Sequence, residues 1–225
     1  MSTNPQAALR HLVENPAFPR SAAYDPRWVA ENMMGPNVLW LAESLSQVLE
    51  FRPEHRILDL GCGRALSSIF LATEFGAQVW AADLWIKPWD NWKRVVDAGL
   101  EDRVFPIYAE AHQLPFAIEF FDLVVSLDAY HYFGTDAEYI GYITRFVKPG
   151  GRMGIVVPAT TAELEEVPPH LALHWSWEFA DGTRRSTPTN TTNSACARGA
   201  GRTASIGSRC SPAAWPGSPP TVDGC

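Results

Sequence analysis

The stretch Ile57-Leu58-Asp59-Leu60-Gly61-Cys62-Gly63 decides the fold class of this chain. Residues 56–60 form a short apolar run that ends at once in two closely spaced glycines. A buried strand that leads into a glycine turn is typical of a strand-turn-helix unit. Apolar residues then recur at helical spacing over 66–75, so we predict a helix there with Gly76 as its C-cap.

Strands and helices alternate on both sides of this stretch. Apolar runs predict further strands at 78–84, 104–108, 121–127 and 153–157, the last after a turn at 148–151. Helical spacing and capping residues predict helices over 37–50, from Asp90 to Gly99, and from a capping box at 135–138 to about Val147. This alternation predicts a doubly wound α/β fold with a mostly parallel sheet and helices on both faces.

The last 43 residues, 183–225, differ in composition from the rest. They contain no Leu, Phe, Tyr, Lys or Glu, but 5 Gly, 5 Pro, 6 Ser and 7 Thr. Such a segment buries too little apolar surface to offset the entropy of ordering, so we predict a disordered tail. We expect no sixth or seventh strand there, which leaves the fold C-terminally incomplete with an exposed sheet edge.

Three interpretations of this tail stay open. It is a solvated tail, a basic segment that touches RNA or the acidic body of the chain, or an aberrant sequence. The last interpretation fits its 5 Arg without Lys, which resemble the shifted-frame translation of a G+C-rich gene.

Charge and cysteine spacing exclude several classes of partner. The formal net charge is -7, and such an acidic chain repels the phosphates of nucleic acids and anionic membranes. Neither a signal peptide nor a run of 18 apolar residues is present, so we predict a cytoplasmic chain without a membrane partner. The cysteines at 62, 196, 210 and 225 lack metal-site spacing, so we predict no metal site. The oligomeric state is not predicted.

Candidate ligand-binding residues follow the first two strands. Ligands of open parallel sheets bind beyond the carboxyl ends of the strands, where the strand order reverses. Gly61 and Gly63 let a ligand approach the backbone at a helix N-terminus, but position 66 lacks the third glycine of a dinucleotide fingerprint. Asp59 favours a cationic ligand group, with a loop-bracing acceptor as the alternative. Asp83, 20 residues after Gly63, suits a ribose diol, with a surface-turn aspartate as the alternative.

Polar residues also follow the third strand. Glu110 is placed to accept a hydrogen bond from an exocyclic amine such as that of adenine, and Ala111 and His112 are placed to offer backbone N–H groups to a ring nitrogen. These motifs in this order resemble the class I S-adenosylmethionine-dependent methyltransferases. The resemblance covers residues 57–63, Asp83, 110–116, 121–126 and 148–151, within roughly 54–158.

The resemblance implies S-adenosylmethionine as cofactor and methyl transfer to a small molecule, as in the bacterial small-molecule branch that segments 24–37, 82–85 and 130–134 resemble. It implies that the cofactor is bound by Asp59, Gly61, Cys62, Gly63, Asp83, Leu84, Glu110, Ala111, His112 and Leu127. His131 is a candidate catalytic base with Tyr130 beside it, and the alternative is an aromatic wall of the pocket.

This assignment divides the chain into an N-terminal helical lid over 1–52, a cofactor-binding domain over 53–182 and the tail over 183–225. Two other functions stay open. A non-catalytic remnant would have the same pocket without turnover. A nicotinamide-dependent oxidoreductase fits less well, because of the missing glycine and because a carboxylate at Asp59 opposes a pyrophosphate.

Overall fold

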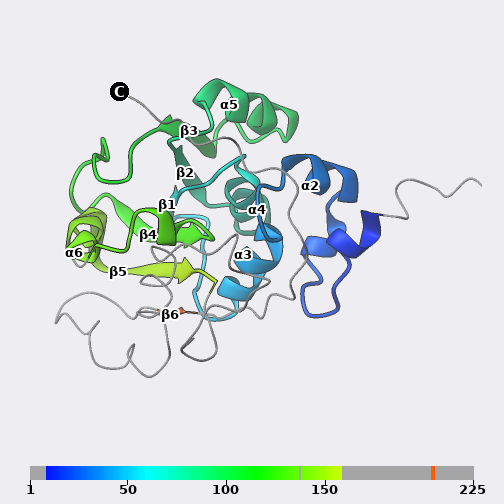
Figure 1. The fold of residues 1–225 in the computed structure, drawn as a ribbon, viewed down its shortest axis with the longest axis horizontal. Coiled ribbons are helices and arrows are strands. Elements are labelled where there is room, and N and C mark those ends of the chain that lie inside the picture. Colours follow the sequence, from blue (N-terminus) through cyan, green and yellow to red (C-terminus); the bar gives the residue numbers. More distant parts are fainter. Residues whose placement is uncertain (1–8, 137, 159–203, 206–225) are drawn as a thin grey trace, which may run out of the picture.

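A parallel sheet forms the centre of the molecule (Figure 1). The structure is a computed structural model and describes residues 9–136, 138–158 and 204–205. The strands are β1 (Arg56–Leu60), β2 (Gln78–Asp83), β3 (Val104–Tyr108), β4 (Phe121–Leu127), β5 (Val147–Val156) and β6 (Ala204–Ser205). Their order is β3-β2-β1-β4-β5-β6, and all neighbours are parallel. The order reverses between β1 and β4, which confirms the predicted doubly wound α/β fold.

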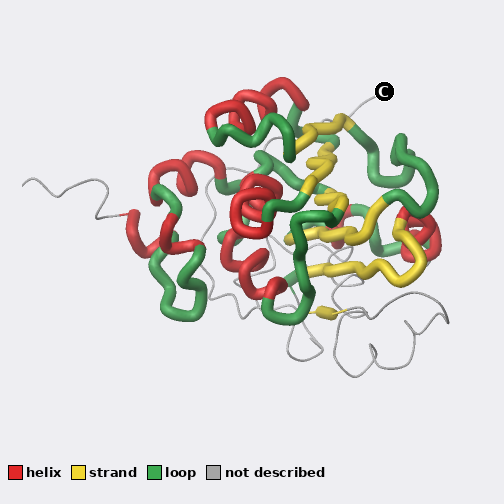
Figure 2. The backbone as a smooth tube through the Cα atoms, turned by 180° about the vertical axis from the view of Figure 1, so that it is seen from behind, coloured by secondary structure: helices red, strands yellow, loops and turns green. Residues whose placement is uncertain are grey.

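Helices lie on both faces of this sheet, which Figure 2 shows from behind. The α-helices are α2 (Pro26–Asn32), α3 (Val38–Ser46), α4 (Leu66–Phe75), α5 (Pro88–Asp97) and α6 (Tyr139–Ile143). Short 3-10 turns are η1 (Arg10–Leu12), η2 (Ser21–Ala23), η3 (Tyr130–Tyr132) and η4 (Thr144–Phe146). None of the helices in the described residues is both long enough and apolar enough to cross a membrane.

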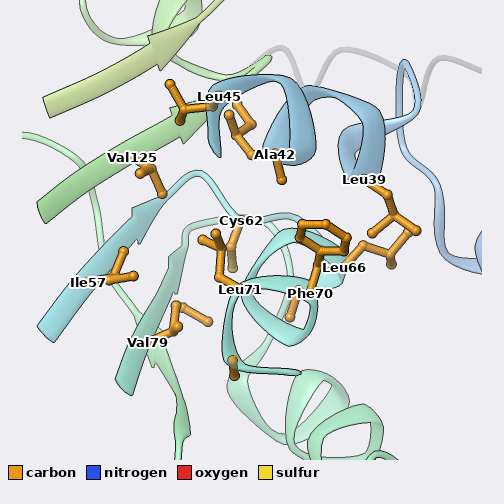
Figure 3. Packing of buried hydrophobic residues seen from close by; sticks show 14 of the residues in the cluster. Leu39, Ala42, Leu45, Ile57, Cys62, Leu66, Phe70, Leu71, Val79 and Val125 are labelled. Carbon is orange, nitrogen blue, oxygen red and sulfur yellow. The ribbon is translucent and has the colours of Figure 1, made fainter. Parts of the chain in front are cut away.

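Side chains of the strands alternate between two buried clusters, as the period of two in a strand requires. Ile57, Val79 and Val125 point to the face that α3 and α4 cover, where they pack with Leu45 and Leu71 (Figure 3). The intervening residues of the strands, such as Leu58 and Val124, pack on the other face against α6. Both faces of the central strands are therefore buried, as expected of a parallel sheet between helices.

The N-terminal segment is tied to the sheet through α3. Asn37 caps this helix by accepting a hydrogen bond from the backbone N–H of Leu39 (3.0 Å). The buried carboxylate of Glu43 in α3 accepts hydrogen bonds from the backbone N–H groups of Arg20 (2.9 Å) and Ser21 (2.8 Å). A buried charge is tolerated when several donors satisfy it, so Glu43 fixes η2 against α3.

Three details of the predicted elements are wrong. Asp90 does not cap α5, which begins two residues earlier with Pro88 at its first turn, a position that suits proline. The predicted capping box fails, because Glu138 stands at the N-cap of α6 without a side-chain cap, and α6 ends at Ile143. The predicted turn at 148–151 lies inside β5, where the register against β4 shifts between Phe121 and Leu123.

The expectation that no strand follows residue 182 is also wrong. Ala204 and Ser205 form β6 and pair with Gly154 and Ile155 of β5. The edge strand β5 offers a row of unpaired backbone N–H and C=O groups. Even a segment with few apolar residues can form hydrogen bonds with some of these groups. The remainder of the predicted tail, with its expected disorder, lies outside the described residues.

Glycine at position 76 is required by backbone geometry alone. Gly76 ends α4 at φ +68°, and a Cβ there would meet nothing closer than Pro53 at 3.5 Å. We predict that Gly76→Ala lowers the free energy of unfolding by about 1 kcal/mol, because an L-residue is strained in the left-handed region.

Gly141→Ala is the matched substitution with the opposite expectation. Gly141 lies inside α6, and a Cβ there meets nothing within 4 Å. Alanine is the better helix former, so this variant should gain about 0.5–1 kcal/mol. Urea unfolding of both variants checks the pair, and shifts of equal sign would contradict the assigned backbone geometry.

Candidate functional site

A cavity of about 280 Å³ opens at the carboxyl ends of β1, β2 and β4, where the strand order reverses. Five segments of the chain surround it, within 32–38, 60–67, 82–85, 109–112 and 127–133. Its lining consists of Asn32, Met34, Gly35, Pro36, Val38, Leu60, Gly61, Cys62, Gly63, Arg64, Leu66, Ser67, Ala82, Asp83, Leu84, Trp85, Ala109, Glu110, Ala111, His112, Leu127, Asp128, Ala129, Tyr132 and Phe133. The position agrees with the rule for ligands of open parallel sheets.

The glycine loop after β1 forms one side of this cavity. Gly61 and Gly63 have φ values of +76° and +53°, which glycine adopts without strain. A Cβ on Gly61 would lie 2.4 Å from the Cβ of Ala129, so glycine also permits the loop after β4 to pack against it. The amide of Asn91 donates to the carbonyl oxygen of Gly63 (2.9 Å) and holds the loop from α5.

Asp83 at the end of β2 fixes the same loop from another side. Its Oδ2 accepts the backbone N–H of Gly63 (2.8 Å), and its Oδ1 accepts those of Trp85 and Ile86 (2.8 Å each). A carboxylate has about four acceptor positions, so about one remains for a ligand. Asp83 thus braces a turn, as in the alternative that the sequence left open, and it also lines the cavity.

Asp59 does not line the cavity. It is 1% exposed, and its Oδ2 accepts the hydroxyls of Ser67 (2.5 Å) and Ser68 (2.6 Å) in the first turn of α4. Its Oδ1 is buried without a hydrogen-bond partner among the described residues. Burial raises the pKa of Asp59 to about 6 despite both serine hydroxyls. This geometry is that of the loop-bracing alternative. Asp59 is connected to the cavity only through its hydrogen bond with Ser67, which is a lining residue.

The remaining predicted cofactor residues all line the cavity. Glu110 accepts the backbone N–H of His112 with Oε2 (2.9 Å), and its Oε1 lies 2.8 Å from the Nδ1 of the same residue. Leu84 and Leu127 supply apolar surface beside it. Cys62 is 7% exposed, and burial raises the pKa of its thiol well above the ordinary value, so the nucleophilic thiolate is disfavoured.

The two predicted catalytic residues lie beside the cavity and are not among its lining residues. Tyr130 packs against Phe133 and Tyr139, and burial raises its pKa to about 12. His131 stacks on Tyr132 with ring centroids 4.1 Å apart, and burial lowers its pKa. Their neighbours Asp128, Tyr132 and Phe133 line the cavity instead. Tyr130 therefore fits the alternative of an aromatic wall.

Further residues contribute to the site beyond the predicted cofactor-binding set. Asp128 has φ +58°, a conformation that aspartate tolerates better than most residues, and its backbone N–H donates to the carbonyl of Val156 (2.7 Å). Arg64 lines the cavity and donates to the carbonyl of Glu31 (2.7 Å). Asn91, which is buried, braces the glycine loop. A lone polar residue within an amphipathic helix carries no sequence signal for such a contact.

The upstream segment that the sequence suggested as a lid reaches the cavity in part. Asn32 accepts a hydrogen bond from Arg94 of α5 (2.6 Å) and lines the cavity with Met34, Gly35 and Pro36. Tyr24 does not line it, because its hydroxyl donates to Glu74 (3.1 Å).

Known proteins resemble this part of the chain. Residues 57–151 match the family model described as a methyltransferase domain. The chain is 30% identical over 128 residues to Methyltransferase GfsG of Streptomyces halstedii, which covers 56% of the chain and 46% of that protein. It is 31% identical over 116 residues to the 27-O-demethylrifamycin SV methyltransferase of Amycolatopsis mediterranei (strain S699), over 51% of the chain and 43% of that relative.

A solved structure also resembles the fold. A candidate S-adenosyl-L-methionine-dependent methyltransferase from Methanococcus maripaludis matches with a TM-score of 0.50 at 22% identity, over 70% of this chain and 68% of that one. At this identity the match supports the fold alone. The chain spans less than half the length of the two curated relatives above.

The buried carboxyl of Asp59 predicts an unusual dependence of stability on pH. Its pKa is about 6 in the folded state against 3.8 as the ordinary value, so the folded state holds the proton more tightly. The stability that this proton contributes is complete below about pH 3.8 and is lost as the pH rises through about 6.

We therefore predict that Asp59→Asn gains stability relative to the natural chain as the pH rises from 4 to 7. The amide oxygen of asparagine still accepts from Ser67 and Ser68, and no charge is buried. Urea unfolding of both proteins at several pH values gives the difference, in which the titration of other groups cancels. A difference that does not change between pH 4 and 7 would contradict the assignment.

Proposed function

We propose that the chain transfers a methyl group from S-adenosylmethionine to a small molecule, since residues 57–151 match the family model described as a methyltransferase domain. The observation that carries the proposal is the cavity at the β1/β4 reversal, since its lining includes every predicted cofactor residue except Asp59. One of the relatives above is named for the acceptor 27-O-demethylrifamycin SV, a small molecule.

The donors and acceptors of the cavity fit the adenosine part of this cofactor. Asp83 keeps about one acceptor position for a ribose hydroxyl after its three backbone contacts. Glu110 and Ala111 line the cavity next to each other and suit the polar edge of adenine, whereas the backbone N–H of His112 already donates to Glu110. Leu84 and Leu127 would contact the faces of the base. This set favours a neutral nucleoside over the pyrophosphate of a dinucleotide.

The glycine loop fits the amino-acid part. Gly61 and Gly63 line the cavity in left-handed backbone conformations, and the Asp83 and Asn91 contacts hold the loop in one conformation. When bound, S-adenosylmethionine supplies a methyl group on a positively charged sulfur. The residues of this chain then bind, orient and shield it from water, which is the main requirement for an in-line transfer.

A proton acceptor is needed when the methyl acceptor must lose a proton. His131, with Tyr130 beside it, stays our candidate for this role, although both residues lie beside the cavity and not on its lining. Burial lowers the pKa of His131, which favours the neutral imidazole that can take up a proton at neutral pH.

The cytoplasmic location of the chain and its division at residues 52 and 182 also remain proposals.

Calorimetric titration with S-adenosylhomocysteine tests the cofactor assignment, with NADH as the control ligand. We predict that the product analogue binds and NADH does not. In Asp83→Ala the affinity for S-adenosylhomocysteine should fall about tenfold or more, because a ribose hydroxyl loses its charged acceptor and the glycine loop loses its anchor.

Asp102→Ala is the matched control, since the Asp102 side chain is 76% exposed and Asp102 is not among the lining residues of the cavity. It should bind like the natural chain, and thermal melts must show that both variants fold. Binding of NADH alone would contradict the proposal. Methyl transfer in an acceptor screen then separates an enzyme from a protein that only binds the cofactor.

A further inference from the structure

The carboxylates of the cavity differ in how many donors already satisfy them. Asp83 accepts three backbone N–H groups, and Glu110 is engaged by His112. Asp128 is the third carboxylate of the lining, and none of the residues that the structure describes donates a hydrogen bond to its side chain. A half-buried carboxylate without a donor is costly, so a ligand with an O–H or N–H group would find a prepared partner there.

Asp128 is held rigidly enough to act as such a partner. Its backbone N–H donates to Val156 at the end of β5, and its neighbours Leu127 and Ala129 are buried. The left-handed conformation at φ +58° turns the chain sharply away from β4 at this residue. Burial raises its pKa to about 6, so the carboxylate still predominates at pH 7.5.

The cavity mouth beside this carboxylate is aromatic and open. Trp85 and Tyr132 both line the cavity, with ring centroids 5.4 Å apart at 62°, an edge-to-face pair. They are nevertheless 63% and 56% exposed, and the neighbouring Met34 and Leu84 are 45% and 41% exposed. Large apolar side chains that gather at the rim of a pocket indicate a surface that a ligand covers.

The charges of the lining limit the ligand further. Asp83, Glu110 and Asp128 face the cavity against the single arginine Arg64 in the described lining. The other titratable groups there are His112, Tyr132 and Cys62. An anionic group would be repelled by the three carboxylates, whereas a neutral or cationic donor would be attracted.

We propose that the methyl acceptor is a neutral or cationic molecule with an O–H or N–H donor bound to Asp128 and a flat apolar frame, aromatic or similar, against Trp85 and Tyr132. This inference rests on the proposed methyltransferase function and names the acceptor class of the same site. It excludes acceptors that present a carboxylate or phosphate at this position.

Four small probes test this class on the full chain saturated with S-adenosylhomocysteine. Phenethylamine and 2-phenylethanol carry a ring with a cationic or neutral donor, phenylacetate carries the ring with an anion, and ethylamine lacks the ring. Calorimetry should show that phenethylamine and 2-phenylethanol bind. The affinities of phenylacetate and ethylamine should be at least about tenfold lower, as expected when one charged hydrogen bond or one aromatic contact is lost.

Two variants locate the contacts. Asp128→Asn keeps the size of the side chain and should weaken phenethylamine about tenfold or more, while S-adenosylhomocysteine binds unchanged. Trp85→Ala should weaken both ring-bearing donors. Asp97→Asn, at an exposed position at the end of α5, is the matched control. It should change the affinity neither for S-adenosylhomocysteine nor for the ring-bearing probes.

The competing role for Asp128 is contact with the cationic sulfur of the cofactor. In that case Asp128→Asn would weaken S-adenosylmethionine far more than the neutral S-adenosylhomocysteine and leave phenethylamine unchanged, which would overturn the inference. Equal binding of phenylacetate and phenethylamine would also overturn it. If S-adenosylhomocysteine itself does not bind, the proposed function fails and this inference fails with it.

Discussion

The hydrogen bond from the Gly63 N–H to the carboxylate of Asp83 is the contact on which the candidate site depends. It joins the loop after β1 to the end of β2, and Asn91 holds the same residue from α5. Because Asp83 also accepts the N–H groups of Trp85 and Ile86, one carboxylate shapes two loops. The cavity is the space that these two loops and the loop after β4 leave between them.

A second layer of contacts supports this loop from below. The buried carboxyl of Asp59 anchors the first turn of α4 through Ser67 and Ser68, although its burial disfavours the charge. Gly61 has no Cβ, and this absence lets Ala129 of the loop after β4 pack against it. These interactions cost stability or limit the sequence, and in return they hold the cavity wall in one conformation.

Much of the fold follows from local sequence patterns, because strands buried on both faces leave apolar runs and α4 carries a clear glycine C-cap. The predicted bounds of β1 and β3 are those of the structure. Patterns failed at β6, where pairing with β5 overrides a poor composition, and at Asp59, where a neighbour eight residues along the chain decides the role. Arg64 and Asn91 make tertiary contacts at the site that no local pattern encodes.

The central claim is that the cavity at the β1/β4 reversal holds an adenosyl cofactor. A crystal structure of the chain with S-adenosylhomocysteine tests it most directly. The account predicts the ribose beside Asp83, the adenine between Glu110 and Leu84, and the amino-acid part along Gly61 and Gly63. A ligand bound outside this cavity, or a ribose without contact to Asp83, would contradict it.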